Sequence, residues 1–215
     1  MKKTILVAGK DMPECSDLSD SLIKNERNVI VSGAEDTPAD KPSDNDNMLF
    51  SNEEISKDFQ TGIHQSKWNR SSSLSTRSFA LQCENVFGSI DEAFIYFDEE
   101  YFASLQEKMD VEEVSKSSDF MITSYQNLVL EIISRFEKAE NQMHNLVFFV
   151  NQCPTLSDAV KNPVLRNGSN ILASPLVASA CSSFISFAEN IAALYGFSKH
   201  QHHSCKKRFN QRFSI

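Results

Sequence analysis

The chain has 215 residues, of which 40% are hydrophobic and 16 are phenylalanine, and its formal net charge at pH 7 is -8. This composition supplies one sizeable core, and the negative charge argues against a general nucleic-acid-binding surface. The five cysteines are scattered and odd in number, which favours a reducing cytoplasm over a disulfide framework. No signal peptide is recognisable and no apolar run approaches the about 18 residues of a membrane span, so we expect a cytoplasmic protein without membrane contact.

The start of the chain predicts a βαβ unit. Residues Thr4–Gly9 form an unbroken apolar run that ends in a glycine, as a central strand of a parallel sheet does. A polar turn, a helix over about 15–26 and a second apolar run at Asn28–Gly33 follow. In folds that open this way, the end of the first strand is where the phosphates of a nucleotide usually sit.

The composition changes sharply over residues 34–60. This stretch contains eight acidic residues against two lysines, and two prolines interrupt it. Acidic, proline-broken sequence of this kind cannot bury enough apolar surface to order itself, so we expect a mobile, disordered surface loop after the second strand.

The rest of the chain alternates strands and helices. The pattern predicts a short third strand that ends at Trp68–Asn69, and then a helix from a serine at 71–73 to Phe87, which Gly88 stops. A strand over 91–97 comes next, followed by the acidic residues Asp98, Glu99 and Glu100. The last three predicted elements are a long helix over 121–136, a strand over 146–151 and a helix over 175–195 that Gly196 caps. This order predicts an α/β fold: a three-layer, Rossmann-like, doubly wound parallel sheet in a single domain, residues 1–198.

The last segment, residues 199–215, is a basic, histidine-rich tail. His200, His202, His203 and Cys205 have nitrogen and sulfur donors at close spacing. Short tails of this type are more often solvated, and bind metals only adventitiously, so no metal site is predicted here.

Three short stretches resemble the short-chain dehydrogenase/reductase family. Residues 87–91 (FGSID) resemble the FG-x-ID entry to that family's fourth strand, and residues 187–192 (FAENIA) resemble the end of its active-site helix. Residues 68–71 (WNRS) resemble the end of its third strand, where an aspartate usually contacts the adenine. The resemblance covers about residues 3–196 and implies the fold of an NAD(P)-dependent oxidoreductase. The sixth and seventh strands that the family places after this helix have no counterpart in the tail, so we expect a C-terminally shortened member.

The resemblance places the family's phosphate-binding glycines on residues 8–15 (AGKDMPEC), where only Gly9 matches. Pro13 stands where close backbone approach to the pyrophosphate is needed, and Asp11 and Glu14 add negative charge. Gly9 and Asn69, the latter at the adenine-contact position, are therefore expected to be vestigial cofactor-binding residues.

The catalytic positions of the family are also replaced. Its tyrosine and lysine fall on Val177 and Cys181, and its serine falls near Gln152 and Cys153. The motif after the fourth strand falls on residues 96–98 (YFD), which puts bulk and charge near the nicotinamide ribose. Without the tyrosine and lysine there is no general acid for a carbonyl oxygen. We interpret Cys181 as a core residue, since it lies on an apolar stripe, and Cys153 as a more accessible thiol that is still structural.

These replacements favour a pseudoenzyme: a protein that has lost NAD(P) binding and catalysis and acts as a non-catalytic interaction or regulatory module. The alternative is an NAD(P)-dependent oxidoreductase with an unconventional site, so whether the chain is an enzyme stays open. A third hypothesis is a receiver-like Mg²⁺ pocket that combines Asp11 and Glu14 with Asp98–Glu100, although the spacing is loose. No cofactor is expected; if one binds, it is NAD, because residues 33–36 offer no arginine for a 2′-phosphate.

The predicted partner is a second copy of the chain, although an unidentified protein partner is also open. The resembled family dimerises through two helices, which correspond to 121–136 and 175–195 here. Apolar residues flank the main stripe of both helices: Val129, Ile133, Ile185 and Phe187. A helix that covers one face of a sheet needs one stripe, so this extra apolar surface predicts a homodimer.

Overall fold

The structure is a computed structural model that describes residues 2–33, 63–105, 111–139, 144–162 and 174–197. Within these residues five strands form one parallel sheet in the order β3-β2-β1-β4-β5. The strands are β1 (Thr4–Met12), β2 (Asn28–Gly33), β3 (Ile63–Lys67), β4 (Glu92–Asp98) and β5 (Asn145–Asn151). This order is that of a doubly wound Rossmann-like sheet, and the predicted fold class is confirmed.

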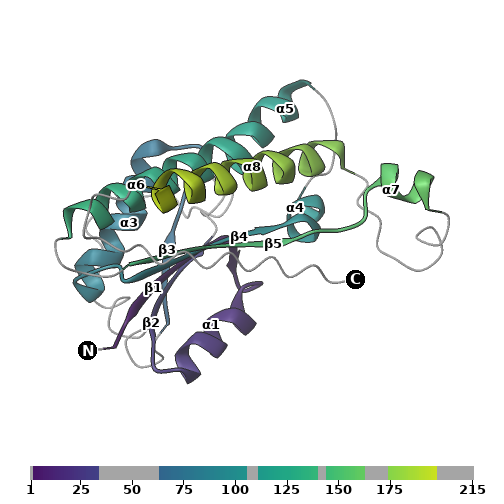
Figure 1. Cartoon of the computed structure of the whole chain (residues 1–215). Coiled ribbons are helices and arrows are strands. Elements are labelled where there is room, and N and C mark those ends of the chain that lie inside the picture. The colour runs from purple at the N-terminus through teal and green to yellow at the C-terminus, as the bar shows by residue number, and fades with distance from the viewer. Residues whose placement is uncertain (1, 34–62, 106–110, 140–143, 163–173, 198–215) are drawn as a thin grey trace, which may run out of the picture.

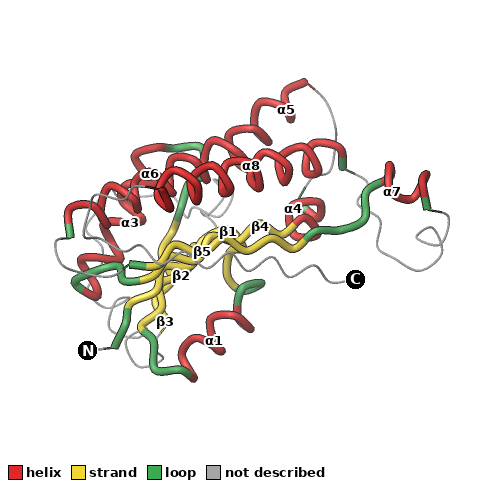
Figure 2. The backbone as a smooth tube through the Cα atoms, viewed as in Figure 1, coloured by secondary structure: helices red, strands yellow, loops and turns green. Residues whose placement is uncertain are grey.

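Helices cover both faces of the sheet and make three layers (Figure 1). One face is covered by α3 (Ser73–Phe87), α6 (Ser124–Lys138) and α8 (Pro175–Phe197), and α1 (Ser16–Lys24) lies on the opposite face. Figure 2 also shows the shorter helices of the chain. They are α4 (Glu99–Ser104), α5 (Val111–Ser118), the π-helical turn η2 (Asp119–Thr123) and α7 (Leu156–Lys161).

The two faces of the sheet differ in how much apolar material they bury. The face under α3, α6 and α8 carries the main core, in which Phe79, Phe97 and Tyr125 are almost completely buried. The face under α1 carries a small cluster, whose buried members are Ile5, Val7, Cys15, Val29 and Val31. Alternate residues of β1 and β2 therefore serve both clusters, which is why these strands read as continuous apolar runs.

Local signals in the sequence placed several elements accurately. The predicted second strand matches β2, and α3 begins after Ser72, whose hydroxyl accepts a hydrogen bond from the backbone N–H of Ser75 at 3.2 Å. Gly88 ends α3 in the left-handed conformation with φ 87°. Ser174 caps α8 in the same way, and Pro175 occupies the first helical position. Capping residues act locally, so their effect is visible in the sequence.

Other boundaries differ from the prediction. The third strand ends at Lys67, so Trp68 and Asn69 lie just after it. The strand expected to end at Gly9 continues to Met12. Gly196 lies inside α8 and does not end it. The short helices α4, α5 and α7 were not predicted, because six to eight residues are too few to show a helical period.

The extra apolar residues of the long helix have an intramolecular explanation. Val129 and Ile133 are buried inside the single chain, with 0% and 7% exposure. The reason is that both lie on the side of α6 that continues from Ile122 and Gln126, and these two residues lie beside Ser183 and Phe187 of α8, so this side is covered within the chain. Their expected role as free surface for a partner is therefore wrong.

One described helix, over Pro175–Tyr195, is long and apolar enough by length and composition to cross a membrane, contrary to the expectation that no stretch qualifies. In this structure α8 packs one face on the sheet through residues that include Val177, Phe184 and Ala188. This apolar window as a whole is 33% buried. The loop over 34–60 and the tail over 199–215 lie outside the described residues.

Candidate functional site

The carboxyl end of β1 holds no open phosphate loop, because the strand itself runs through that position. After a bulge that follows Val7, β1 regains its pairing with β2 at Met12, opposite Gly33. Gly9 adopts φ +129°, and a Cβ there would overlap the carbonyl oxygen of Tyr96 and lie 2.9 Å from the Tyr125 hydroxyl. Gly9 is therefore required for packing against the neighbouring strand and helix within the chain itself.

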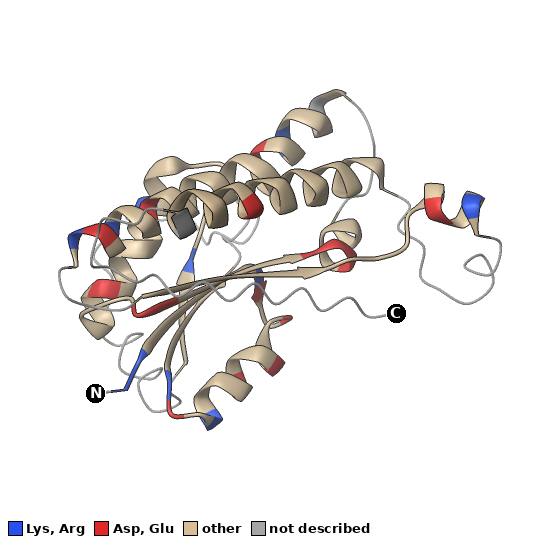
Figure 3. Ribbon diagram, in the orientation of Figure 1, with Lys and Arg blue, Asp and Glu red and all other residues tan. Residues whose placement is uncertain are grey.

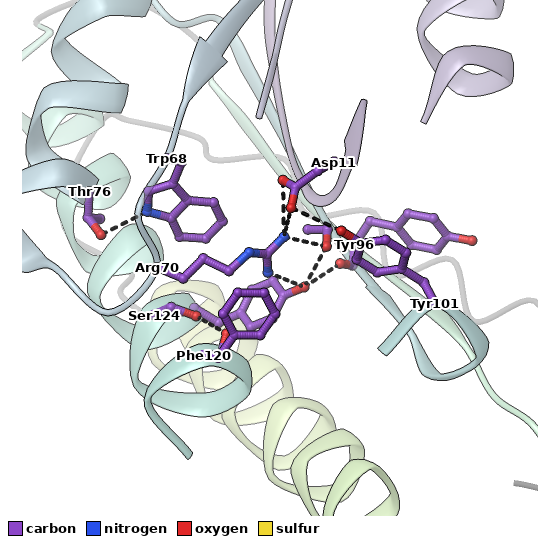
Figure 4. Close-up of polar contacts among 10 residues, drawn as sticks. Asp11, Trp68, Arg70, Thr76, Tyr96, Tyr101, Phe120 and Ser124 are labelled. Carbon is purple, nitrogen blue, oxygen red and sulfur yellow. Dashed lines mark hydrogen bonds and ion pairs between the residues drawn. The ribbon is translucent and has the colours of Figure 1, made fainter. Parts of the chain in front are cut away.

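Arg70 fills the space beside this strand end (Figure 4). It follows β3, its side chain is 1% exposed, and one terminal nitrogen donates to the Gly9 carbonyl at 2.7 Å. The same nitrogen lies 3.3 Å from both carboxylate oxygens of Asp11. Burial acts to lower the pKa of the Arg70 guanidinium, but Tyr125 and Asp11 together raise it by more than burial lowers it. The pKa is therefore higher than that of a free arginine, and the group stays charged.

Aromatic rings surround this guanidinium. Its central carbon lies 4.6 Å from the Trp68 ring centroid and 4.7 Å from that of Phe120. The rings of Phe102 and Tyr125 are at 5.4 Å and 5.7 Å. We call Arg70, Asp11 and these four rings the Arg70 cluster. Such contacts stabilise a desolvated cation, and they leave the guanidinium enclosed by protein.

The cluster is closed by residues from β4 and α4. The Tyr101 hydroxyl donates to Asp11 at 3.0 Å, and the Tyr125 hydroxyl donates to the Tyr96 carbonyl at 2.7 Å. Burial and the nearby charge of Asp11 raise the pKa of Tyr101, so its phenol stays protonated and donates. The hydroxyls of Tyr101 and Tyr125 and the Asp11 carboxylate are therefore bonded inside the chain, whereas Arg70 Nε is buried without a hydrogen-bond partner among the described residues.

A second ion pair lies next to the cluster. Lys10 Nζ is 2.9 Å from Asp98 Oδ2, and Asp98 is only 2% exposed. The Tyr96 hydroxyl and the Asn151 amide also donate to Asp98, at 3.1 Å and 3.3 Å. Burial alone acts to raise the pKa of Asp98, but hydrogen bonds from Lys10 and from the Tyr101 backbone hold it below its usual value.

The residues to which the resemblance assigns the family's catalytic positions lie at the carboxyl end of β5 and on α8. Val177 and Cys181 are 0% and 1% exposed and belong to the main core, so the prediction that Cys181 is a core residue is confirmed. Glu99, the first residue of α4, lies beside them: its carboxylate accepts from the backbone N–H of Cys153 at 2.6 Å. Burial, the charge of Glu99 and a hydrogen bond to it raise the pKa of the Cys181 thiol. Cys153 is half-buried, and its thiol pKa is raised too, first by burial. These thiols are poor nucleophiles because the thiolate is disfavoured.

Asn69 serves the start of α3. Its side-chain oxygen accepts from the backbone N–H of Ser71 at 3.0 Å, and its own N–H donates to the Ser75 hydroxyl at 2.9 Å. No group of three or more potential metal ligands occurs among the described residues. Asp11, which the Mg²⁺ hypothesis needs, is engaged by Arg70 and Tyr101.

Arg70 is the residue that the sequence reasoning passed over. It stands within residues 68–71, at the carboxyl end of β3, while Asp11 stands at the carboxyl end of β1. Because carboxyl ends of parallel strands share one edge of the sheet, opposite charges at two such ends were a usable signal.

Comparisons with known proteins agree with the fold. A search of family models finds no match, and no curated protein matches significantly. Among solved structures, an NADH-dependent reductase complexed with NAD is 13% identical, with TM-score 0.59, covering 97% of this chain and 76% of its own. A Serratia marcescens short-chain dehydrogenase/reductase is 11% identical, with TM-score 0.56 and coverage of 90% and 69%. One from Saccharomyces cerevisiae is 14% identical, with TM-score 0.54 and coverage of 89% and 65%. The chain therefore has a short-chain dehydrogenase/reductase-like fold.

Proposed function

We propose that this chain is a non-catalytic member of the short-chain dehydrogenase/reductase fold, which no longer binds NAD(P) and works as an interaction or regulatory module. The observation that carries the proposal is the Arg70 cluster. A buried cation, its carboxylate partner and four aromatic rings stand at the carboxyl ends of β1 and β3, where folds of this type place a dinucleotide. A dinucleotide would have to displace groups that are already paired.

The residues at the carboxyl end of β5 and on α8 support the same proposal. Val177 offers no acidic proton at the family's tyrosine position, and Cys181 offers no positive charge at its lysine position. Of the described tyrosines of the site, Tyr96 and Tyr101 donate to buried carboxylates and Tyr125 donates to the Tyr96 carbonyl. The pKa values of all three are raised, first by burial. Proton donation to a carbonyl oxygen requires a tyrosine whose pKa is lowered, and a tyrosine with a raised pKa is a weaker acid than that.

Calorimetric titration with NAD, NADH, NADP and NADPH tests this proposal. We expect no heat of binding with any of the four, under conditions in which circular dichroism reports a folded chain. A dinucleotide-binding reductase titrated in parallel is the positive control. Micromolar binding of a dinucleotide would overturn the proposal and favour the unconventional oxidoreductase; NAD is the first candidate, because residues 33–36 lack an arginine.

We also propose that α6 and α8 form a two-fold contact between copies, now through a narrower surface. Leu130 on α6 is 52% exposed, and Ile185 and Phe187 on α8 are half-buried at the edge of the core. The exposed residues of α8 include the small Ser179, Ser182 and Ser186, which allow close approach of another helix. Light scattering tests this contact: Leu130→Asp with Phe187→Asp should give monomers, whereas the control Leu74→Asp on α3 should not. A wild-type chain that is monomeric at every concentration would contradict it.

We further propose a cytoplasmic location. All four described cysteines are free, and three of them are buried, which suits a reducing compartment. Imaging of a fluorescent fusion tests this, and retention in a secretory compartment would contradict it.

A further inference from the structure

The outer edge of β5 is the feature that neither the proposed function nor the helix contact uses. β5 is the last strand in the sheet order, and among the residues that the structure describes no strand pairs with its far side. Its pairing with β4 is continuous from Asn145 to Asn151, without a bulge. Within the described part of the chain, this edge is therefore a regular row of backbone donors and acceptors without a strand partner.

β5 lacks the features that normally keep an edge strand from pairing. Its sequence, NLVFFVN, contains no charged residue and no proline (Figure 3). Leu146, Val147 and Phe148 are 6–9% exposed, so both faces of the strand are apolar. Charges, prolines and bulges are the usual protection of edge strands, and a strand without them resembles an interior strand of a sheet.

The sequence of β5 is complementary to itself. In an antiparallel pair of two copies centred on Phe148, Leu146 of one copy faces Val150 of the other, and Val147 faces Phe149. Asn145 then faces Asn151, and Phe148 faces its own equivalent. Every pair is apolar or uncharged, and both members of each pair lie on the same face of the sheet, because the positions differ by an even number. No like charges oppose each other anywhere along the strand.

The half-buried Phe149 gives this pairing a further reason. Its ring stacks on Phe94 at 5.3 Å and meets Tyr96 edge-on at 6.4 Å, on the face of the sheet opposite α6 and α8. Together these rings form a partly exposed aromatic patch beside the edge. In the antiparallel pair, Phe149 of each copy covers Val147 of the other and extends this patch across the two-fold axis.

From this edge we infer that β5 is a self-association surface: two copies pair antiparallel through β5 and join their sheets into one continuous sheet. The inference is independent of whether a dinucleotide binds, and it uses a different surface from the contact through α6 and α8. A seven-residue edge alone buries less than the about 1,000 Å² of a stable interface, so the dimer is concentration-dependent.

The test measures mass by light scattering over a wide concentration range, for the wild type and three variants. Phe149→Lys should lower the association constant about tenfold, because it replaces two cross-strand apolar contacts. Phe149→Tyr keeps the ring and should associate as the wild type does. Leu74→Lys changes a residue of α3 that is 72% exposed, and it should also leave association unchanged. Circular dichroism checks that each variant is folded.

Amide hydrogen exchange of the wild type gives a second readout that needs no substitution. Exchange of the β5 amides should slow as the concentration rises, while exchange in α3 stays constant. A monomer at all concentrations, or β5 exchange that ignores concentration, would overturn the inference. So would a dimer that Phe149→Lys leaves intact but Leu130→Asp with Phe187→Asp abolishes, since the helices would then be the interface. Binding of a dinucleotide would contradict the proposed function, but it would not affect this inference.

Discussion

The two halves of the carboxyl edge of the sheet are occupied by different kinds of contact. Beside β1 and β3, the Arg70 cluster joins a buried ion pair to aromatic rings. Beside β5 and α8, Val177 and Cys181 are packed in the apolar core, and Glu99 holds the Cys153 backbone. The first half thus depends on pairing of charges and the second on close packing. Substitutions should distinguish the two halves. When one charged residue of the ion pair is removed, neutralising its partner should recover stability, whereas no such second substitution compensates for disrupted packing.

Arg70→Met should have the largest effect. Removing one member of a buried ion pair leaves the Asp11 carboxylate uncompensated, so we expect the free energy of unfolding to fall by about 3–5 kcal/mol. Urea unfolding measures it. The double variant Arg70→Met with Asp11→Asn should recover a large part of the loss, and Arg70→Lys should not, because lysine lacks the planar fork. A loss as large in the double variant as in the single one would show that the charge is not the cause.

Val177→Tyr tests the packed half. It introduces a tyrosine at a position with 0% exposure, where overpacking should cost about 1–3 kcal/mol of stability. The matched control is Ser182→Tyr, at an exposed position of the same helix, which should cost little. Urea unfolding of both variants gives the comparison. Equal stability of the two would mean that α8 has room for a catalytic side chain.

Asp98→Asn should give a smaller, pH-dependent effect. Because the folded chain holds the pKa of Asp98 below its usual value, the carboxylate adds stability above its unfolded pKa of about 3.9, and this is lost as the pH falls through the folded value. At neutral pH the variant should be less stable by about 1–3 kcal/mol. Unfolding curves from neutral to acid pH should converge with the wild type. Asp20→Asn, on the exposed side of α1, is the control. If the stability of Asp98→Asn stayed below that of the wild type by the same amount at every pH, the prediction would be wrong.

Thiol labelling tests whether the packed half opens in the native chain, and it should show the smallest effect, since it changes no stability. Cys153 is half-buried, whereas Cys83 and Cys181 are buried and their thiol pKa values are raised chiefly by that burial. Alkylation mapped by mass spectrometry should modify Cys153 before these two in the native chain, and all three equally in urea. Early native labelling of Cys181 would show that the packed half opens.

The sequence by itself determined the strands, the long helices and their order. Apolar runs such as Asn28–Gly33 and caps such as Ser72 and Gly88 report local burial and local hydrogen bonding, so they can be read without the fold. The assignment of the family's tyrosine and lysine positions to Val177 and Cys181 also came from the sequence, because a motif has a fixed spacing, and it stays a prediction.

Only the tertiary structure decided how the site is filled. Arg70 and Asp11 are 59 positions apart, and they meet because β3 and β1 end at the same edge of the sheet. The burial of Val129 and Ile133 likewise depends on α8 lying beside their side of α6, which no helical period reveals. Periodicity records that a side chain is buried, and the sheet order decides which distant side chain it meets.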